Sequence, residues 1–291
     1  MTRITRLLPD TRFGLGEGPV WDDRAQVLYF VDIAARALHR LDPETGAHTS
    51  WAFDEKISCL GLTEGDGILV SGQSGLWLLN PADGSRALRF PIPALPADMR
   101  TNDGKVGPDG CFWVGTMTDS DTRGPDGFLM RIAPDGEVRV VLKGLTTPNG
   151  LGWSADGARL YYAETRDRTV DLFDVGVDGA LSNRRRFADI PADCGRPDGA
   201  AFDAEGHYWV AGIDAGRVNR IAPHGRIASH VDLPTPMVTM PCFGGPDLRT
   251  VFVTSLIRKG ADDPQAGGLF SFRAPVAGRL PHRFKIRGNL I

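Results

Sequence analysis

The chain has 291 residues, with 33 Lys and Arg against 36 Asp and Glu, which gives a formal charge of −3. This balance argues against a nucleic-acid binder that relies on a basic face and against a polybasic membrane anchor. Apolar residues make up 42% of the chain, enough to bury a core, and the 36 Gly and 21 Pro indicate many tight turns.

Pairs of short runs rich in Val, Leu, Tyr, Phe and Trp recur along the chain and are separated by turns of the Asp-Gly kind. In chain order, the pairs are 27–32 with 37–41, 67–70 with 75–79, 111–115 with 127–132, 160–163 with 170–174, 207–211 with 217–221, and 250–254 with 268–272. Asp-Gly between apolar runs indicates a hairpin, because Gly tolerates a positive φ. No long segment has the period of a helix.

Each pair follows a further short apolar run, and these first runs are regularly spaced. They are anchored on Trp21, Leu62, Val106, Trp153, Phe202 and Phe243. Successive anchors lie about 40–50 residues apart, a period typical of the blades of a β-propeller. We therefore expect an all-β chain that forms one six-bladed β-propeller domain over residues 1–291. The alternative is an all-β sandwich or barrel, which also has evenly spaced hairpins.

A polar residue stands four positions before the anchor in every predicted blade. These residues are Glu17, Ser58, Asn102, Asn149, Asp198 and Thr239. The first strand of each blade lines the central channel, so equivalent positions point toward one spot on the axis. Convergent carboxylates repel one another unless a cation lies among them. Carboxylate and amide oxygens suit a hard divalent ion such as Ca²⁺, Mg²⁺ or Mn²⁺, although Asn-Gly and Asp-Gly are also ordinary turn residues.

Six short motifs in order give the chain a resemblance to a known family. They are LGEGP at 15–19, RTNDGK at 100–105, GTM at 115–117, PNGL at 148–151, PDG at 197–199 and PCFGG at 241–245. Together they resemble the gluconolactonase/regucalcin (senescence-marker-protein) family. The resemblance implies a six-bladed propeller with one divalent metal at the channel mouth.

By motif position, the resemblance assigns the metal ligands to Glu17, Asn149 and Asp198, and the substrate-binding pair to Arg100 and Asn102. Some family members also use an acidic residue three positions after the GTM motif. That position is Ser120 in this chain, between Asp119 and Asp121. Residues 119–124 are expected to form a long solvated hairpin loop near the channel mouth.

These residues predict a metal-dependent lactonase that opens a sugar (aldono-) lactone to the aldonic acid. A divalent ion polarises a carbonyl and lowers the pKa of water, and Asp198 is the most plausible base. Three oxygen ligands accept Ca²⁺, Zn²⁺, Mn²⁺ or Fe²⁺. Two alternatives remain open at this point: a related propeller esterase or organophosphate hydrolase, and a non-catalytic calcium-binding propeller.

The expected partner is a small-molecule sugar lactone, with no nucleic acid and no membrane. The basic run 184–186 is expected to be an isolated turn. No apolar segment of a secretory signal follows the N-terminus, and no run reaches the ~18 apolar residues of a membrane span. We therefore expect a cytoplasmic protein, whose oligomeric state the sequence leaves open.

Overall fold

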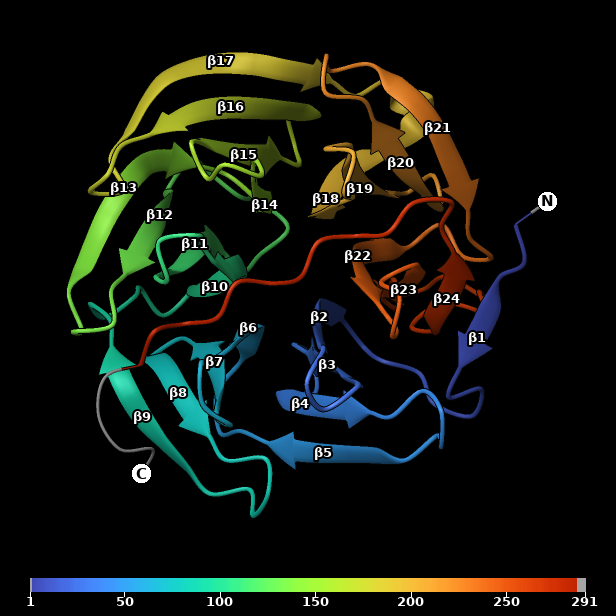
Figure 1. Ribbon diagram of the computed structural model, residues 1–291, viewed down its shortest axis with the longest axis horizontal. Coiled ribbons are helices and arrows are strands. Elements are labelled where there is room, and N and C mark those ends of the chain that lie inside the picture. Colours follow the sequence, from blue (N-terminus) through green and yellow to red (C-terminus); the bar gives the residue numbers. More distant parts are fainter. Residues whose placement is uncertain (1, 287–291) are drawn as a thin grey trace.

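The computed structural model describes residues 2–286 as six four-stranded antiparallel sheets arranged in a ring (Figure 1). The six-bladed β-propeller predicted from the repeat is therefore confirmed. The innermost strands of the blades are β2 (Gly16–Asp22), β6 (Ile57–Leu62), β10 (Met99–Val106), β14 (Pro148–Trp153), β18 (Arg196–Phe202) and β22 (Val238–Gly244). All six anchor residues lie within these strands, as the spacing predicted.

The predicted strand pairs form the middle of each blade. The second strands are β3 (Val27–Asp32), β7 (Ile68–Gly72), β11 (Phe112–Thr118), β15 (Arg159–Glu164), β19 (Tyr208–Ile213) and β23 (Thr250–Ser255). The third strands are β4 (Ala37–Leu41), β8 (Gly75–Leu79), β12 (Gly127–Ile132), β16 (Thr169–Val175), β20 (Arg217–Ile221) and β24 (Leu269–Arg273). Helical structure in the described residues is confined to one 3₁₀ turn, η1 (Ala192–Cys194), and no described helix is long and apolar enough to cross a membrane.

Outer strands complete the blades, and the last blade takes its outer strand from the start of the chain. The outer strands are β5 (His48–Ala52), β9 (Arg86–Pro91), β13 (Val138–Leu145), β17 (Leu181–Asp189), β21 (Ile227–Asp232) and β1 (Thr5–Leu7). β1 pairs antiparallel with β24, so the N-terminal segment closes the ring. This closing strand is too short to stand out in the sequence.

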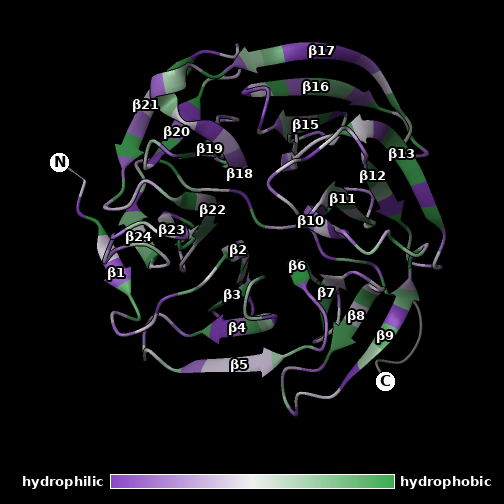
Figure 2. Cartoon of the chain, turned by 180° about the vertical axis from the view of Figure 1, so that it is seen from behind, coloured by the Kyte–Doolittle hydropathy of each residue, from purple (hydrophilic) through white to green (hydrophobic). Residues whose placement is uncertain are grey.

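The basic run 184–186 lies in the middle of strand β17, so the expectation of an isolated turn was wrong. Its guanidinium groups form ion pairs with Asp171, Asp174 and Asp189. The run of exposed residues from 182 to 186 suits an outer strand at the edge of a blade. Figure 2 shows hydrophilic and hydrophobic segments following one another along β17 and β21.

Apolar side chains fill the gaps between neighbouring blades rather than one central core. Six buried clusters lie one in each gap. Trp21 of β2 stacks on Phe252 of β23 across the gap that closes the ring, with ring centroids 5.6 Å apart. Trp113 and Trp153 meet edge to face between the third and fourth blades. The blades thus bury their apolar faces against one another, and the predicted polar positions of the inner strands lie where those strands begin.

A C-terminal strap, defined here as residues 274–286, crosses one end of the channel (Figure 1). Its backbone donates from Arg279 to the carbonyl of Phe202 at 3.1 Å and from Phe284 to the carbonyl of Leu62 at 2.8 Å. The Phe284 ring is fully buried between the second and third blades. A mainly apolar cavity of about 190 Å³ lies beneath the strap. The strap therefore covers the end of the channel where the inner strands finish.

Candidate functional site

The candidate site lies at the opposite, open end of the channel, where the inner strands begin. We call this end the mouth. Every inner strand has a register shift at its predicted polar position, including the shifts between Glu17 and Val20 and between Asn149 and Gly152. Such a bulge re-aims side chains and often borders functional sites. Gly18 and Gly150, which follow Glu17 and Asn149, have φ of 52° and 61°, a conformation that favours glycine.

Glu17 and Asp198 come from the first and fifth blades and lie within electrostatic reach of one another. Burial raises the pKa of Glu17 well above its ordinary value, and the charges of Asp198 and Asp103 raise it further. Burial, followed by the charge of Asp103, raises the pKa of Asp198 to about 7. The Asp198 side chain is only 7% exposed. The structure thus brings the two predicted carboxylates together.

The buried amide of Asn149 is held on both sides. Its Nδ2 donates to Oγ1 of Thr165 at 2.8 Å, and its Oδ1 accepts from Nδ2 of Asn102 at 2.8 Å. Thr165 donates in turn to the carbonyl of Pro197, next to Asp198, at 2.7 Å. An amide oxygen has two lone pairs, so one remains for a further partner.

Arg100 and Asn102 lie side by side on β10 and are buried. Nη1 of Arg100 donates to Oδ1 of Asn102 at 2.7 Å, and Nε donates to Oδ1 of Asp119 at 3.0 Å. Asn102 also donates to the carbonyl of Pro148 at 2.9 Å. The amide of Asn102 therefore links Arg100 to Asn149 in the next blade.

Ser120 lies in the mouth loop between β11 and β12, residues 119–126, where the long hairpin loop was expected. Its hydroxyl donates within the loop to the carbonyl of Thr122 at 2.8 Å. The neighbouring Asp119 instead faces the site, where it forms ion pairs with Lys56 and Arg100. Of the three candidates at this position, Asp119 is the one that the structure places against Arg100.

Asp103 is a site residue that the sequence reasoning missed. It is 5% exposed, accepts a hydrogen bond from the backbone of Leu151 at 2.9 Å, and leaves its other oxygen, Oδ1, buried without a partner. Lys105, on the same strand, offsets part of its charge and donates to the carbonyls of Leu151 and Ala200. Its position next to Asn102 in the RTNDGK motif could have identified it as a site residue. Asn-Asp-Gly is also an ordinary turn sequence, however, so the motif alone did not single it out.

These residues fit a divalent cation. Within residues 2–286, neither Glu17 nor Asp198 forms an ion pair, and Asp103 keeps an unpartnered buried oxygen. Two carboxylates and an amide oxygen form the donor set that hard cations prefer. A cation would remove the repulsion that raises the pKa of Glu17 and Asp198.

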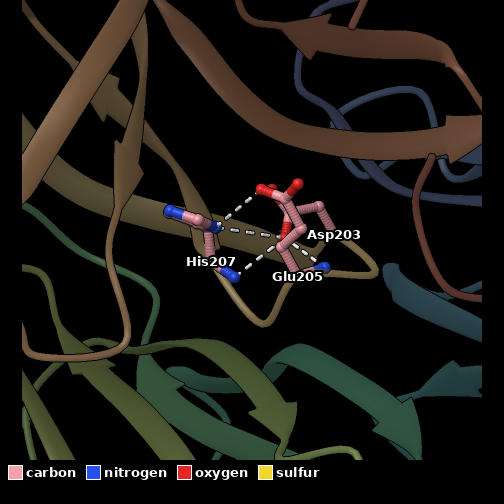
Figure 3. A group of neighbouring side chains, drawn as sticks. All are labelled: Asp203, Glu205 and His207. Carbon is pink, nitrogen blue, oxygen red and sulfur yellow. Dashed lines mark hydrogen bonds and ion pairs between the residues drawn. The ribbon is translucent and has the colours of Figure 1, made fainter. Parts of the chain in front are cut away.

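A second group of possible metal ligands lies at the far end of the channel, in the turn between β18 and β19. Asp203, Glu205 and His207 turn toward one another there (Figure 3). The guanidinium of Arg220 already contacts all three, at 2.9 Å from Asp203, 2.8 Å from Glu205 and 3.0 Å from His207. Because an internal cation satisfies these side chains, we assign this group to the stability of the blade.

Fold and site together define a six-bladed propeller with an acidic, amide-containing centre at its channel mouth. The chain matches the family model "SMP-30/Gluconolactonase/LRE-like region" over residues 15–257 and belongs to this family. The predicted family resemblance is therefore confirmed.

Similar proteins come from several branches of the family. A 6-deoxy-6-sulfogluconolactonase of Pseudomonas putida is 39% identical over 272 residues, 91% of this chain and 92% of the relative. A pentonolactonase of Haloferax volcanii is 37% identical over 98% of this chain and 99% of its own. The crystal structure of a calcium-binding protein, regucalcin, from Agrobacterium tumefaciens has a TM-score of 0.91 at 28% identity and covers 97% of each chain.

Proposed function

We propose that the protein is a lactonase that hydrolyses a sugar lactone to the open-chain aldonic acid with the help of one divalent metal ion. The observation that carries this proposal is that the buried carboxylates of Glu17 and Asp198 lie within electrostatic reach of one another and form no ion pair in residues 2–286. Asn149 is linked through Thr165 to the carbonyl next to Asp198. Both relatives named above as lactonases exceed 35% identity and match almost the whole chain.

Glu17, Asn149 and Asp198 would hold the ion. When bound, a divalent ion supplies Lewis-acid polarisation of a lactone carbonyl and lowers the pKa of water. Ca²⁺, Zn²⁺, Mn²⁺ and Fe²⁺ are the candidate ions, and the Agrobacterium relative is described as calcium-binding.

Asp198 would act as the general base. The oxygen of a water molecule attacks the carbonyl carbon while its proton passes to a carboxylate oxygen of Asp198. The ring carbon–oxygen bond then breaks, and the departing ring oxygen takes the proton from Asp198 to become a hydroxyl group, which returns Asp198 to its ionised form. Without the ion the pKa of Asp198 is raised to about 7, and a bound cation would lower it, so Asp198 would be ionised and able to accept a proton at neutral pH.

Arg100 and Asn102 would orient the sugar. Arg100 presents a rigid fork of donors suited to ring and hydroxyl oxygens, and Asp119 fixes that fork from behind at 3.0 Å. Because the Arg100 side chain is buried, it loses little conformational entropy when substrate binds. Ser120 stays a predicted substrate contact of the mouth loop.

The test is a pH-indicator assay of acid release from a panel of sugar lactones, with the metal-free protein reconstituted with each ion in turn. We expect EDTA to abolish the rate above spontaneous opening. Asp198→Ala should lower turnover by at least about 100-fold, the usual range for loss of a general base. The control is Asp193→Ala, an exposed carboxylate near the mouth. Turnover of Asp198→Ala within about threefold of wild type at saturating metal would contradict the assignment.

A further inference from the structure

Four cationic side chains gather on one side of the mouth, around the loop 119–126 and the neighbouring turn 165–168. We call Lys56, Arg100, Arg123 and Arg166 the cationic mouth cluster. Arg166 donates from Nη2 to the carbonyl of Asp121 at 2.6 Å, and Arg123 donates from Nε to the carbonyl of Ser120 at 2.8 Å. The first bond ties the turn of the fourth blade to the loop of the third, and the second lies within that loop.

The acids of this region form ion pairs with two members of the cluster and leave the other two, in the described residues, without such a partner. Asp119 is shared between Lys56 and Arg100. Within the described part of the chain, the guanidinium groups of Arg123 and Arg166 form no ion pair, and their observed hydrogen bonds go to backbone carbonyls. The charges of Asp119 and Asp121 reach Arg123, but neither carboxylate forms an ion pair with Arg123 or Arg166 in the described residues.

Arg123 lies within electrostatic reach of the candidate site. It is half-buried in the loop, and its charge lowers the pKa of Asp198 in the fifth blade. Burial, followed by the charges of Arg100 and Arg166, lowers the pKa of Arg123 itself. Half-buried cations that repel one another gain stability when an anion lies between them.

We propose that the cationic mouth cluster binds an oxyanion, a sulfonate or phosphate group, carried by the substrate on the carbon farthest from the lactone carbonyl. This inference rests on the proposed lactonase function and narrows its substrate class from neutral to anionic sugar lactones. Arg123 and Arg166 supply the donors, because a guanidinium fork matches the geometry of such an oxyanion. The name of the Pseudomonas putida relative, a 6-deoxy-6-sulfogluconolactonase, contains a group of this class.

The cluster acts through binding and takes no part in bond breaking. With the lactone carbonyl at Glu17, Asn149 and Asp198, the other end of the sugar extends toward the loop 119–126. Fixing both ends aligns the carbonyl with Asp198, so the contact raises the rate of reaction as well as the affinity.

The experiment compares D-glucono-1,5-lactone with its 6-phospho and 6-deoxy-6-sulfo counterparts on the metal-loaded protein. We expect kcat/KM for at least one of the two anionic lactones to exceed that for the neutral lactone by at least about tenfold, a difference of ~1.4 kcal/mol. Whichever anionic lactone is favoured identifies the source of the oxyanion. Arg123→Gln and Arg166→Gln should each lower this preference about tenfold.

The matched control is Arg36→Gln. Arg36 is also exposed, lies in the turn between β3 and β4 at the same mouth, and donates to the carbonyl of Asp54 at 3.1 Å. Its removal takes away the same charge on the far side of the ring and should leave the preference within about twofold of wild type. An equal loss of the preference for the anionic lactone in all three variants would overturn the proposal. The preference would then depend on the net charge of the protein and not on a site formed by Arg123 and Arg166.

Two further outcomes separate this inference from the lactonase assignment. If the neutral lactone is hydrolysed best, the inference fails and the lactonase function stands. If no lactone is hydrolysed, calorimetric titration with 6-phosphogluconate and gluconate decides the inference alone. Tighter binding of the phosphorylated acid, weakened by Arg123→Gln, supports the cluster as an oxyanion site, and equal binding of both acids overturns it.

Discussion

Nδ2 of Asn102 donates to Oδ1 of Asn149 at 2.8 Å, so a side chain of the third blade fixes the amide of the fourth. Thr165 holds the other half of the same amide. The oxygen of Asn149 is thereby presented to the centre in one orientation. Groups that orient a ligand in this way commonly change metal affinity 10- to 100-fold when they are lost.

Thr165→Val should therefore weaken metal binding roughly tenfold, because the Asn149 amide loses the acceptor that fixes its rotation. Thr165→Ser keeps the hydroxyl and should bind metal as wild type does. Calorimetric titration of the metal-free protein with Ca²⁺ or Mn²⁺ measures both variants. Equal affinities for the valine and serine variants would show that the clamp has no effect on the metal.

Asp198→Asn should stabilise the protein in EDTA at pH 8 while abolishing stabilisation by metal. The raised pKa of Asp198 means that its ionised form is unfavourable in the folded protein, so a neutral side chain of the same shape relieves that cost. We expect the metal-free Tm to rise by roughly 2–4 °C, the change that ~1 kcal/mol produces in a protein of this kind. Differential scanning calorimetry with and without metal provides the measurement, with Asp193→Asn as the control.

His39 should contribute to the loss of stability in acid. Burial, followed by the nearby His48, lowers the pKa of His39 from 6.5 to about 4. Between these two pH values His39 is protonated in the unfolded chain but neutral in the folded protein. The free energy of unfolding therefore decreases as pH falls from about 6.5 to about 4. The full contribution is about 3 kcal/mol.

His39→Phe should flatten this acid limb, since the ring packs against Phe13 and Phe30 in any case. Urea unfolding at pH 7 and pH 4.5 compares the two proteins. His230→Phe serves as the control, because that histidine lies on the outer strand β21. An unchanged difference between the two pH values in His39→Phe would remove His39 as the cause.

Phe284→Ala should destabilise the protein by about 3–5 kcal/mol. The ring is fully buried and meets Phe90 edge to face at 5.2 Å, so its removal leaves a cavity between two blades. Leu280→Ala, on the same strap but 48% exposed, should cost little. Equilibrium unfolding in guanidinium chloride measures both, and equal costs would mean that the strap is not anchored by Phe284.

The repeat, the strand pairs and the polar positions of the inner strands could be predicted from the sequence, because period and turn residues are local signals. Asp103 could not, since its role depends on its closeness to Glu17 and Asp198, which come from other blades. Likewise, β1 has only three residues and is recognisable as a strand only because it pairs with β24 at the other end of the chain.

The directions of the side chains in the loop 119–126 could not be predicted from the sequence either. Asp119, Ser120 and Asp121 are adjacent, yet Asp119 pairs with Arg100, Ser120 bonds within the loop, and the carbonyl of Asp121 receives Arg166. Which neighbour faces the site depends on the path of the loop backbone and on a turn in the next blade. Neither is encoded in the spacing of the motif.

In the described residues, the strap crosses the far end of the channel, so we expect small molecules to enter and leave by the mouth. Arrival of the next lactone must therefore wait until the acid has left, and the acid should compete with the lactone for the free protein.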